Sequence, residues 1–151
     1  MDSTYLLPVI GVQLHGIRGE AIEKLIDRGH TIIVNEISLF ELSAKGAKYI
    51  RNGKLSSERV ITGINAIIHD DSITKISCYE ASNLRVSFIL RTFLNDFVDC
   101  LIVSSGMNNS EILLSEDDDI HGLKTNQKFQ ELMATIDSTC KIMRLNEILR
   151  A

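Results

Sequence analysis

The sequence predicts one α/β domain with a mostly parallel sheet, and three observations lead to this prediction. Segments with the helical spacing of apolar residues alternate with short runs of apolar and β-branched residues. The chain has 151 residues, which fits a single domain with one core. It contains one proline and no low-complexity linker. Strands that alternate with helices imply a parallel sheet covered on both faces, with ligand sites at the carboxyl ends of its strands.

The first half of the chain predicts three helices and two strands. Apolar residues at helical spacing place the helices over residues 19–28, 38–51 and 57–68. Gly29 ends the first helix, because glycine commonly follows a helix C-terminus. Ser38 and Glu41 fit the capping-box pattern at the start of the second helix. The strands are expected over residues 31–34, which are mostly β-branched, and 73–79, which alternate.

The second half predicts three further helices and two further strands. The helices are expected over residues 80–95, 97–107 and 129–136, and the strands over 111–115 and 139–145. The first of these strands leads into an acidic run, Glu116–Asp119.

Composition narrows the class of protein. Aromatic residues are few and Trp is absent, which argues against a single-strand binder built on a wide aromatic platform. The net charge of −4 argues against tight, non-specific binding to nucleic acid, although it does not exclude a nucleic-acid partner. The three cysteines, Cys78, Cys100 and Cys140, have no CxxC spacing and are expected to be core thiols of a cytoplasmic protein. The apolar runs are too short to span a bilayer, so no membrane association is expected.

Several acidic residues fall where predicted strands end or predicted helices begin. They are Asp2, Glu41, Asp99, Asp117 and Asp119. Carboxylates gathered from distant parts of a chain repel one another unless a cation neutralises them. Mg²⁺ and Mn²⁺ prefer such oxygen ligands, and they can activate both a phosphate and the attacking water. The pattern therefore indicates metal-dependent hydrolysis of a phosphodiester.

Each of these acids also has a simpler interpretation. Asp2 is then a disordered terminal residue, Glu41 and Asp99 are helix caps or charges near helix N-termini, and Asp117–Asp119 form a solvated loop. Basic residues after Glu41, among them Lys45, are either a rim for RNA phosphates or a solvated helix face. His121, directly after the acidic run, is a further candidate for substrate contact.

Four short motifs occur in order along the chain. They are Asp2-Ser3-Thr4-Tyr5-Leu6-Leu7, Ser38-Leu39-Phe40-Glu41-Leu42, Asp99-Cys100-Leu101-Ile102-Val103 and Leu113-Leu114-Ser115-Glu116-Asp117-Asp118-Asp119-Ile120. The ordered set resembles the PIN-domain family, which includes the VapC-type toxins, over nearly the whole chain. The fourth motif, an apolar strand followed by Ser, any residue, Asp, any residue and Asp, is the most specific.

The resemblance implies a three-layer α/β/α sandwich and an endoribonuclease dependent on Mg²⁺ or Mn²⁺, with the toxin of a toxin–antitoxin pair as one role of such an enzyme. The metal-binding acids it implies are Asp2, Glu41, Asp99 and Asp117, with Asp119 as an accessory acid and Thr4 and Ser115 as orienting hydroxyls. Asp96 is the alternative to Asp99, and Glu36 is the alternative to Glu41. The implied partners are RNA, an antitoxin-like protein and a second copy of the chain.

The chain departs from the family pattern at its start. PIN domains carry a hydrophobic first strand before the opening Asp, whereas only Met1 precedes Asp2 here. The first strand is therefore expected to be truncated or missing, either because the recorded chain starts downstream or because this is a shortened relative. A catalytically weak PIN-like module that binds RNA or protein is the alternative function.

Overall fold

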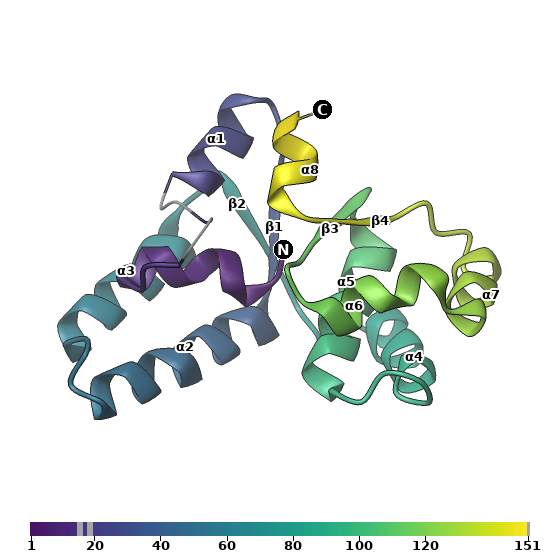
Figure 1. The fold of residues 1–151 in the computed structure, drawn as a ribbon, viewed down its shortest axis with the longest axis horizontal. Helices are drawn as coiled ribbons and strands as arrows, with labels where there is room; N and C mark the ends of the chain where they lie inside the picture. Colours follow the sequence, from purple (N-terminus) through teal and green to yellow (C-terminus); the bar gives the residue numbers. More distant parts are fainter. Residues whose placement is uncertain (15–16, 18–19, 151) are drawn as a thin grey trace. The chain divides into compact units, whose positions relative to one another are not determined.

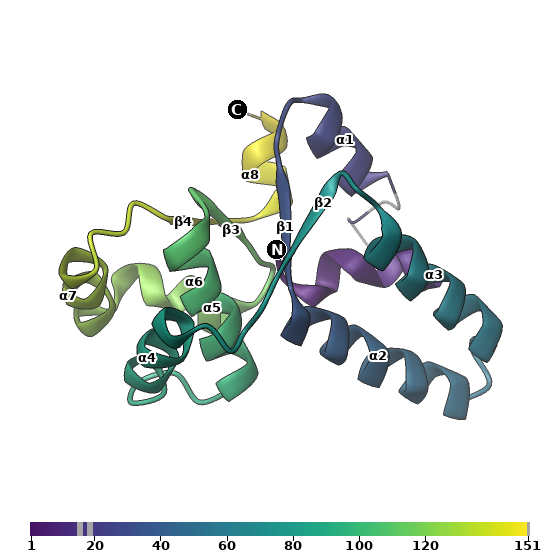
Figure 2. The ribbon, with the colours of Figure 1, turned by 180° about the vertical axis from the view of Figure 1, so that it is seen from behind.

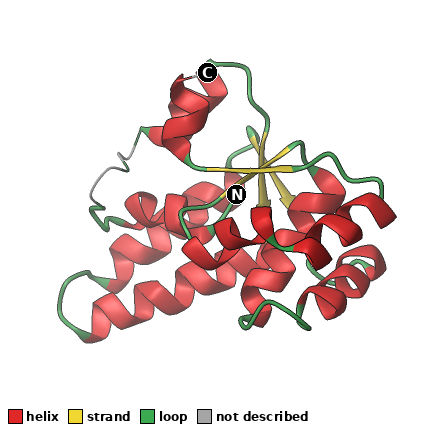
Figure 3. Cartoon of the chain, turned by 45° about the vertical axis from the view of Figure 1, so that its right-hand side comes forward, coloured by secondary structure: helices red, strands yellow, loops and turns green. Residues whose placement is uncertain are grey.

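The protein is described by a computed structural model that covers residues 1–14, 17 and 20–150 (Figure 1). It divides into two compact units: the first is Asp2–Ile76, and the second is Ser77–Ala151 together with Met1. Each unit contains helices and one pair of parallel strands (Figure 3). The mixed α/β class with parallel strands is thereby confirmed, while the single-domain organisation stays a prediction.

The first unit places helices around the strand pair β1–β2. Its elements are the 3₁₀ helix η1 (Ser3–Ile10), α1 (Ala21–Asp27), β1 (Ile32–Asn35), α2 (Glu36–Arg51), α3 (Ser57–His69) and β2 (Ile73–Ile76). The strands run side by side in parallel, from Ile32 opposite Ile73 to Asn35 opposite Ile76 (Figure 2). The helices α2 and α3 pack against each other and against η1. The first residues of the chain are thus held by the helices that surround β1 and β2.

The second unit is built around α5 and the strand pair β3–β4. Its elements are α4 (Ala81–Leu90), α5 (Phe97–Asn109), β3 (Ile112–Leu114), α6 (Asp118–Gly122), the 3₁₀ helix η2 (Leu123–Thr125), α7 (Gln127–Thr135), β4 (Lys141–Met143) and α8 (Leu145–Arg150). Every residue of α5 from Cys100 to Met107 is buried, and the helix packs against α4 and β3. Such all-round burial explains why α5 is apolar on every side.

The predicted elements are all present, with ends that differ by a few residues. Gly29 ends α1 as expected: it adopts a left-handed backbone with φ of 86°, and its N–H donates to the carbonyl of Ile26. Gly19, the predicted start of that helix, lies outside the described residues. The elements η1, α6, η2 and α8 were not predicted, because each is short or follows an irregular apolar pattern.

The predicted capping box at Ser38 and Glu41 is wrong. The helix α2 begins two residues earlier, at Glu36, and its N-cap is Asn35, whose Oδ1 accepts a hydrogen bond from the N–H of Ile37 at 2.8 Å. Asn is among the best N-cap residues, so the helix starts directly at the end of β1. Ser38 is then buried inside the helix, and Glu41 lies in its second turn.

Two expectations about composition can be compared with the structure. Cys78, Cys100 and Cys140 are all buried and free, which confirms their place in the core. Burial raises the pKa of the Cys100 thiol to about 11, so this residue stays protonated at neutral pH. None of the helices in the described residues has the length and apolar character needed to cross a membrane.

Candidate functional site

The acids predicted for the site are divided between the two units. Asp2 and Glu41 belong to the first unit, and Asp99, Asp117 and Asp119 belong to the second. Each unit therefore carries its own group of carboxylates.

In the first unit, Glu41 takes part in a closed ring of three polar contacts. Ser3 Oγ donates to Glu41 Oε2 at 2.6 Å, and Lys45 Nζ lies 2.9 Å from Glu41 Oε1. Lys45 Nζ also donates to Ser3 Oγ at 3.0 Å, which closes the ring. Each oxygen of the Glu41 carboxylate thus has a different partner.

The elements explain why these three side chains meet. Glu41 and Lys45 are four residues apart on α2, a spacing that places them one turn apart on the same helix face. Ser3 begins η1, which packs against α2. The Ser3 side chain is fully buried, whereas the Glu41 and Lys45 side chains are 28% and 35% exposed. The ion pair is therefore open to water on one side and backed by a buried hydroxyl on the other.

Asp2 lies just before η1 and is itself buried, only 6% exposed. The interpretation of Asp2 as a disordered terminal residue is therefore wrong. Thr4, predicted to orient a carboxylate, donates through Oγ1 to Asp2 Oδ2 at 3.4 Å, a long contact. Ser3 makes the shorter contact, to Glu41, and its role was not predicted.

The alternatives to Glu41 and Asp99 lie at helix starts. Glu36 is the exposed first residue of α2, and Asp96 caps α5 by accepting from the N–H of Val98 at 2.7 Å. Glu41 is beyond the first turn of its helix, so it is not simply a helix-terminal charge. Asp99 is partly buried in the first turn of α5, a position that also stabilises the helix N-terminus.

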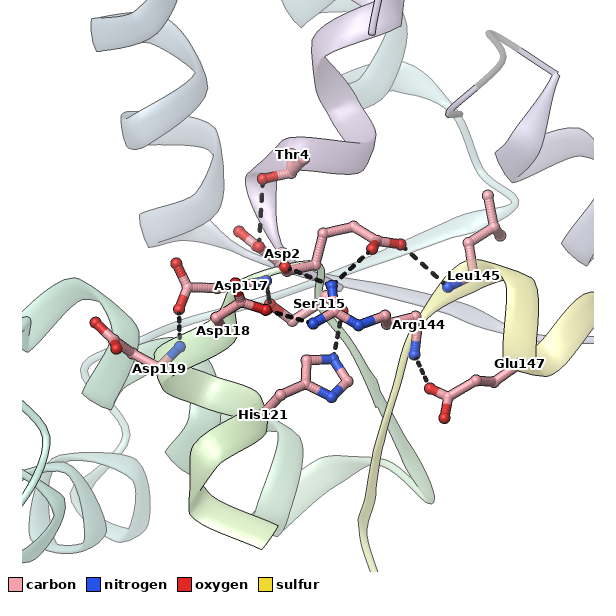
Figure 4. Close-up of polar contacts among 11 residues, drawn as sticks. Asp2, Thr4, Ser115, Asp117, Asp118, Asp119, His121, Arg144, Leu145 and Glu147 are labelled. Carbon is pink, nitrogen blue, oxygen red and sulfur yellow. Dashed lines mark hydrogen bonds and ion pairs between the residues drawn. The ribbon is translucent and has the colours of Figure 1, made fainter. Parts of the chain in front are cut away.

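In the second unit, the acidic loop (residues 115–119) joins β3 to α6. Asp117 is the N-cap of α6: its Oδ1 accepts from the N–H group of Asp119 at 2.8 Å (Figure 4). The same oxygen accepts from the N–H group of Ile120 at 3.2 Å. The N–H of Asp117 in turn donates to Oγ of the fully buried Ser115 at 3.1 Å. Asp117 is therefore fixed on both sides. Asp117, Asp118 and Asp119 are all exposed, as the interpretation of a solvated loop expects, although Asp118 and Asp119 form the start of α6.

Arg144, which follows β4, binds two other acids of this loop, and Figure 4 shows its contact with Asp118. Its Nη1 donates to the carbonyl oxygen of Glu116 at 2.8 Å and to Glu116 Oε2 at 3.1 Å. Its Nη2 donates to Asp118 Oδ1 at 2.6 Å. These hydrogen bonds, led by the one to Asp118, raise the pKa of Arg144 above its ordinary value. Sequence reasoning missed Arg144 because 26 residues separate it from Asp118.

The four acids of the run Glu116–Asp119 fall into two groups, according to whether they contact Arg144. Glu116 and Asp118 are paired with Arg144, while Asp117 caps a helix through one oxygen only. Within the described residues, the exposed side chain of Asp119 forms no hydrogen bond or ion pair. The two acids of the run that form no ion pair with Arg144 are thus Asp117 and Asp119, which occupy the two Asp positions that the fourth motif specifies.

Two further polar groups complete the acidic loop. His121 Nε2 lies 2.9 Å from the carbonyl oxygen of Ser115, which fixes the ring against the loop. Glu147 Oε2 accepts from the N–H of Arg144, and this hydrogen bond is the main reason why the pKa of Glu147 is lowered. Both the backbone N–H and the guanidinium group of Arg144 are thus held by hydrogen bonds.

We expect Arg144→Met to loosen the acidic loop. The substitution removes both ion pairs but keeps an aliphatic chain, so the N–H groups of Asp119 and Ile120 should exchange with solvent roughly threefold to tenfold faster. Amide hydrogen exchange measured by NMR checks this expectation. Lys141→Met, which removes an exposed positive charge from β4, is the control and should leave both rates unchanged. Equal rates in the wild type and Arg144→Met would show that the ion pairs do not hold the loop.

The chemistry of these side chains fits a divalent metal. All candidate ligands are carboxylate oxygens, the type that Mg²⁺ and Mn²⁺ prefer. In the part of the chain that the structure describes, no three His, Cys, Asp or Glu side chains are grouped to hold a metal ion. Mg²⁺ is commonly held by one or two carboxylates together with water and substrate phosphate, so a larger group is not required.

Comparison with known proteins gives no match to a family model, to a curated protein or to a solved structure. The resemblance to PIN domains therefore stays a prediction from the four sequence motifs.

Proposed function

We propose that this chain is a metal-dependent endoribonuclease that hydrolyses RNA phosphodiester bonds. The observation that carries the proposal is the arrangement of the acidic loop. Arg144 pairs with Glu116 and Asp118, while Ser115 and α6 fix Asp117 with one oxygen directed outward. A solvated acidic run would not need a buried serine and an arginine to set its conformation.

In this proposal, the finer fold is a three-layer α/β/α sandwich of PIN type. The parallel pairing of β1 with β2 and of β3 with β4, each pair flanked by helices, supports it. A cytoplasmic location is part of the same proposal and is supported by the three free, buried cysteines.

The proposal assigns the metal to Asp2, Glu41, Asp99 and Asp117. Bound Mg²⁺ or Mn²⁺ would supply Lewis-acid activation of the phosphodiester and of water. The hydroxyl of Ser3 fixes one oxygen of Glu41, and Ser115 fixes the backbone of Asp117. Thr4 orients Asp2, and Asp119 is an accessory acid beside Asp117.

A cleavage assay with Asp99→Asn tests the proposal. We expect the purified wild type to cleave mixed RNA with Mn²⁺ and to lose activity in EDTA. Because Asn keeps the shape of Asp but binds metal poorly, Asp99→Asn should cleave at least tenfold to a hundredfold more slowly, roughly the effect of disturbing a metal ligand. If the wild type and Asp99→Asn degrade RNA equally, the activity is a contaminant and the proposal fails.

Asp96→Asn is the matched control for that assay. Asp96 caps α5 through its side chain, and Asn caps helices about as well, so this variant should keep both its stability and its activity. A loss of cleavage in Asp96→Asn, with Asp99→Asn active, would move the metal ligand from Asp99 to Asp96.

A catalytically weak binding module is the second candidate, and one observation favours it. Phe88 and Phe97 stack at the surface with ring centroids 5.9 Å apart, and they are 59% and 38% exposed. Tyr79, in the same unit, is 75% exposed. Exposed aromatic side chains of this kind serve as contacts for bases or for a protein partner. RNA that is retained in a gel-shift assay but is not cleaved with Mn²⁺ would support the binding module over the enzyme.

The toxin role implies two protein partners, an antitoxin-like inhibitor and a second copy of the chain. Exposed Ile61 and Ile68 on α3 support such contacts, because large apolar side chains at a surface are common in interfaces. Sedimentation of the purified protein separates monomer from dimer.

A further inference from the structure

We infer that Lys45 is an internal counter-ion of Glu41, and that a divalent metal reaches Glu41 by displacing the Lys45 ammonium group. The inference rests on the proposed function, since it concerns one of the carboxylates assigned to the metal. It assigns a role to Lys45, for which the sequence allowed two interpretations. Lys45 was expected to belong either to a rim that binds RNA phosphates or to a solvated helix face.

The geometry shows which carboxylate oxygen is accessible to a metal. Oε2 of Glu41 is held at 2.6 Å by the hydroxyl of Ser3, and that side chain is fully buried. Oε1 is held at 2.9 Å by Lys45, whose side chain is 35% exposed. Ser3 is fully buried, so turning its hydroxyl away from Oε2 would cost a buried hydrogen bond, whereas Lys45 can rotate into water on its flexible stem. A metal that binds Glu41 therefore takes Oε1 and leaves Oε2 with Ser3.

Replacement of the Lys45 ammonium group by a divalent metal is electrostatically feasible. An ion pair that is open to solvent is weak, so its loss is a small penalty compared with binding a doubly charged cation. Before metal binds, the ammonium group neutralises Glu41, so the carboxylate needs no other cation to stay beside buried Ser3. Lys45 thus lowers the apparent affinity for metal, both by occupying Oε1 and by like-charge repulsion.

Mn²⁺ binding to Lys45→Met tests the inference. Met keeps most of the aliphatic stem and removes the charge, so we expect this variant to bind Mn²⁺ roughly threefold to tenfold more tightly than the wild type. The signal of free Mn²⁺ in electron paramagnetic resonance measures the affinity without any activity assay. Lys48→Met changes the net charge by the same amount at an exposed position of α2 and should bind like the wild type.

A double-mutant cycle with Glu41→Gln shows whether the effect acts through Glu41. If it does, Lys45→Met has no effect on Mn²⁺ affinity in the Glu41→Gln background. Lys45→Gln, which retains a hydrogen-bond donor but no charge, replaces Lys45→Met if circular dichroism shows that the Met variant is unfolded.

The Mn²⁺-binding results distinguish a failure of the counter-ion role of Lys45 from a failure of the proposed function. Equal or weaker Mn²⁺ binding by Lys45→Met, with binding by the wild type intact, overturns the counter-ion role and leaves the proposed function standing. If Lys45→Met also raises the Mn²⁺ affinity in the Glu41→Gln background, the counter-ion role is overturned as well. If neither the wild type nor any variant binds Mn²⁺, the proposed function fails and the counter-ion role fails with it.

Discussion

Asp117→Asn is expected to lower Mn²⁺-dependent RNA cleavage roughly a hundredfold while changing the free energy of unfolding by less than about 1 kcal/mol. RNA cleavage and stability are expected to respond differently because the two carboxylate oxygens of Asp117 have different roles. Oδ1 of Asp117 caps α6 by accepting two backbone hydrogen bonds, and the carbonyl oxygen of Asn can take over that task. The loss therefore falls on the charge that a metal requires and not on the helix.

Asp118→Asn is the matched control, because it removes the same charge from the next residue. The Asp118 carboxylate is paired with Arg144, so it is not expected to contribute to metal binding, and cleavage should stay within about threefold of the wild type. Cleavage rates and urea unfolding midpoints of the two variants provide the comparison. Equal losses in both, or full activity in Asp117→Asn, would show that the acidic loop does not use Asp117 as proposed.

Gly63→Ala is expected to destabilise the first unit by roughly 1–3 kcal/mol. Gly63 lies in α3 where this helix meets η1, and a Cβ atom there would be 2.6 Å from the carbonyl oxygen of Val9 and 2.9 Å from Cα of Ile10. Both atoms belong to the backbone, so no side chain can rotate away to make room. The higher helix propensity of Ala, worth about 1 kcal/mol, offsets only part of the clash.

Gly122→Ala is the control for this substitution. Gly122 is also helical, but a Cβ atom added there meets nothing within 4 Å, so this variant should be neutral or slightly stabilised. Urea unfolding followed by circular dichroism measures both variants. If Gly63→Ala unfolds at the midpoint of the wild type, the contact between α3 and η1 must be able to open without cost.

Those parts of the fold that depend on residue periodicity could be predicted from the sequence. Apolar spacing located α1 and α3, and Gly29 marked the end of α1, because these signals act within one or two helical turns. The start of α2 was misplaced because both Asn35 and Ser38 are good N-cap residues. Only the backbone at the end of β1, which is extended at Asn35, decides between them.

The contacts that define the candidate site were harder to predict, because they join residues far apart in the chain. Ser3 meets Glu41 across 38 residues, and Arg144 meets Glu116 across 28 residues. No spacing rule connects such pairs, since their approach depends on how η1 packs on α2 and how β4 pairs with β3. The acids of the acidic loop could be proposed from the sequence because Asp117 comes three residues after the end of a recognisable strand.

The order of the two units along the chain has a consequence for synthesis on the ribosome. The first unit uses only residues Asp2–Ile76, so all of its partners have been made before the second unit begins. At about 5–20 residues per second, the rest of the chain takes roughly 4–15 s to follow, which is ample time for a small unit to fold. We therefore expect the nascent chain to form the pair between Glu41 and Lys45 before Asp99 and Asp117 have been translated.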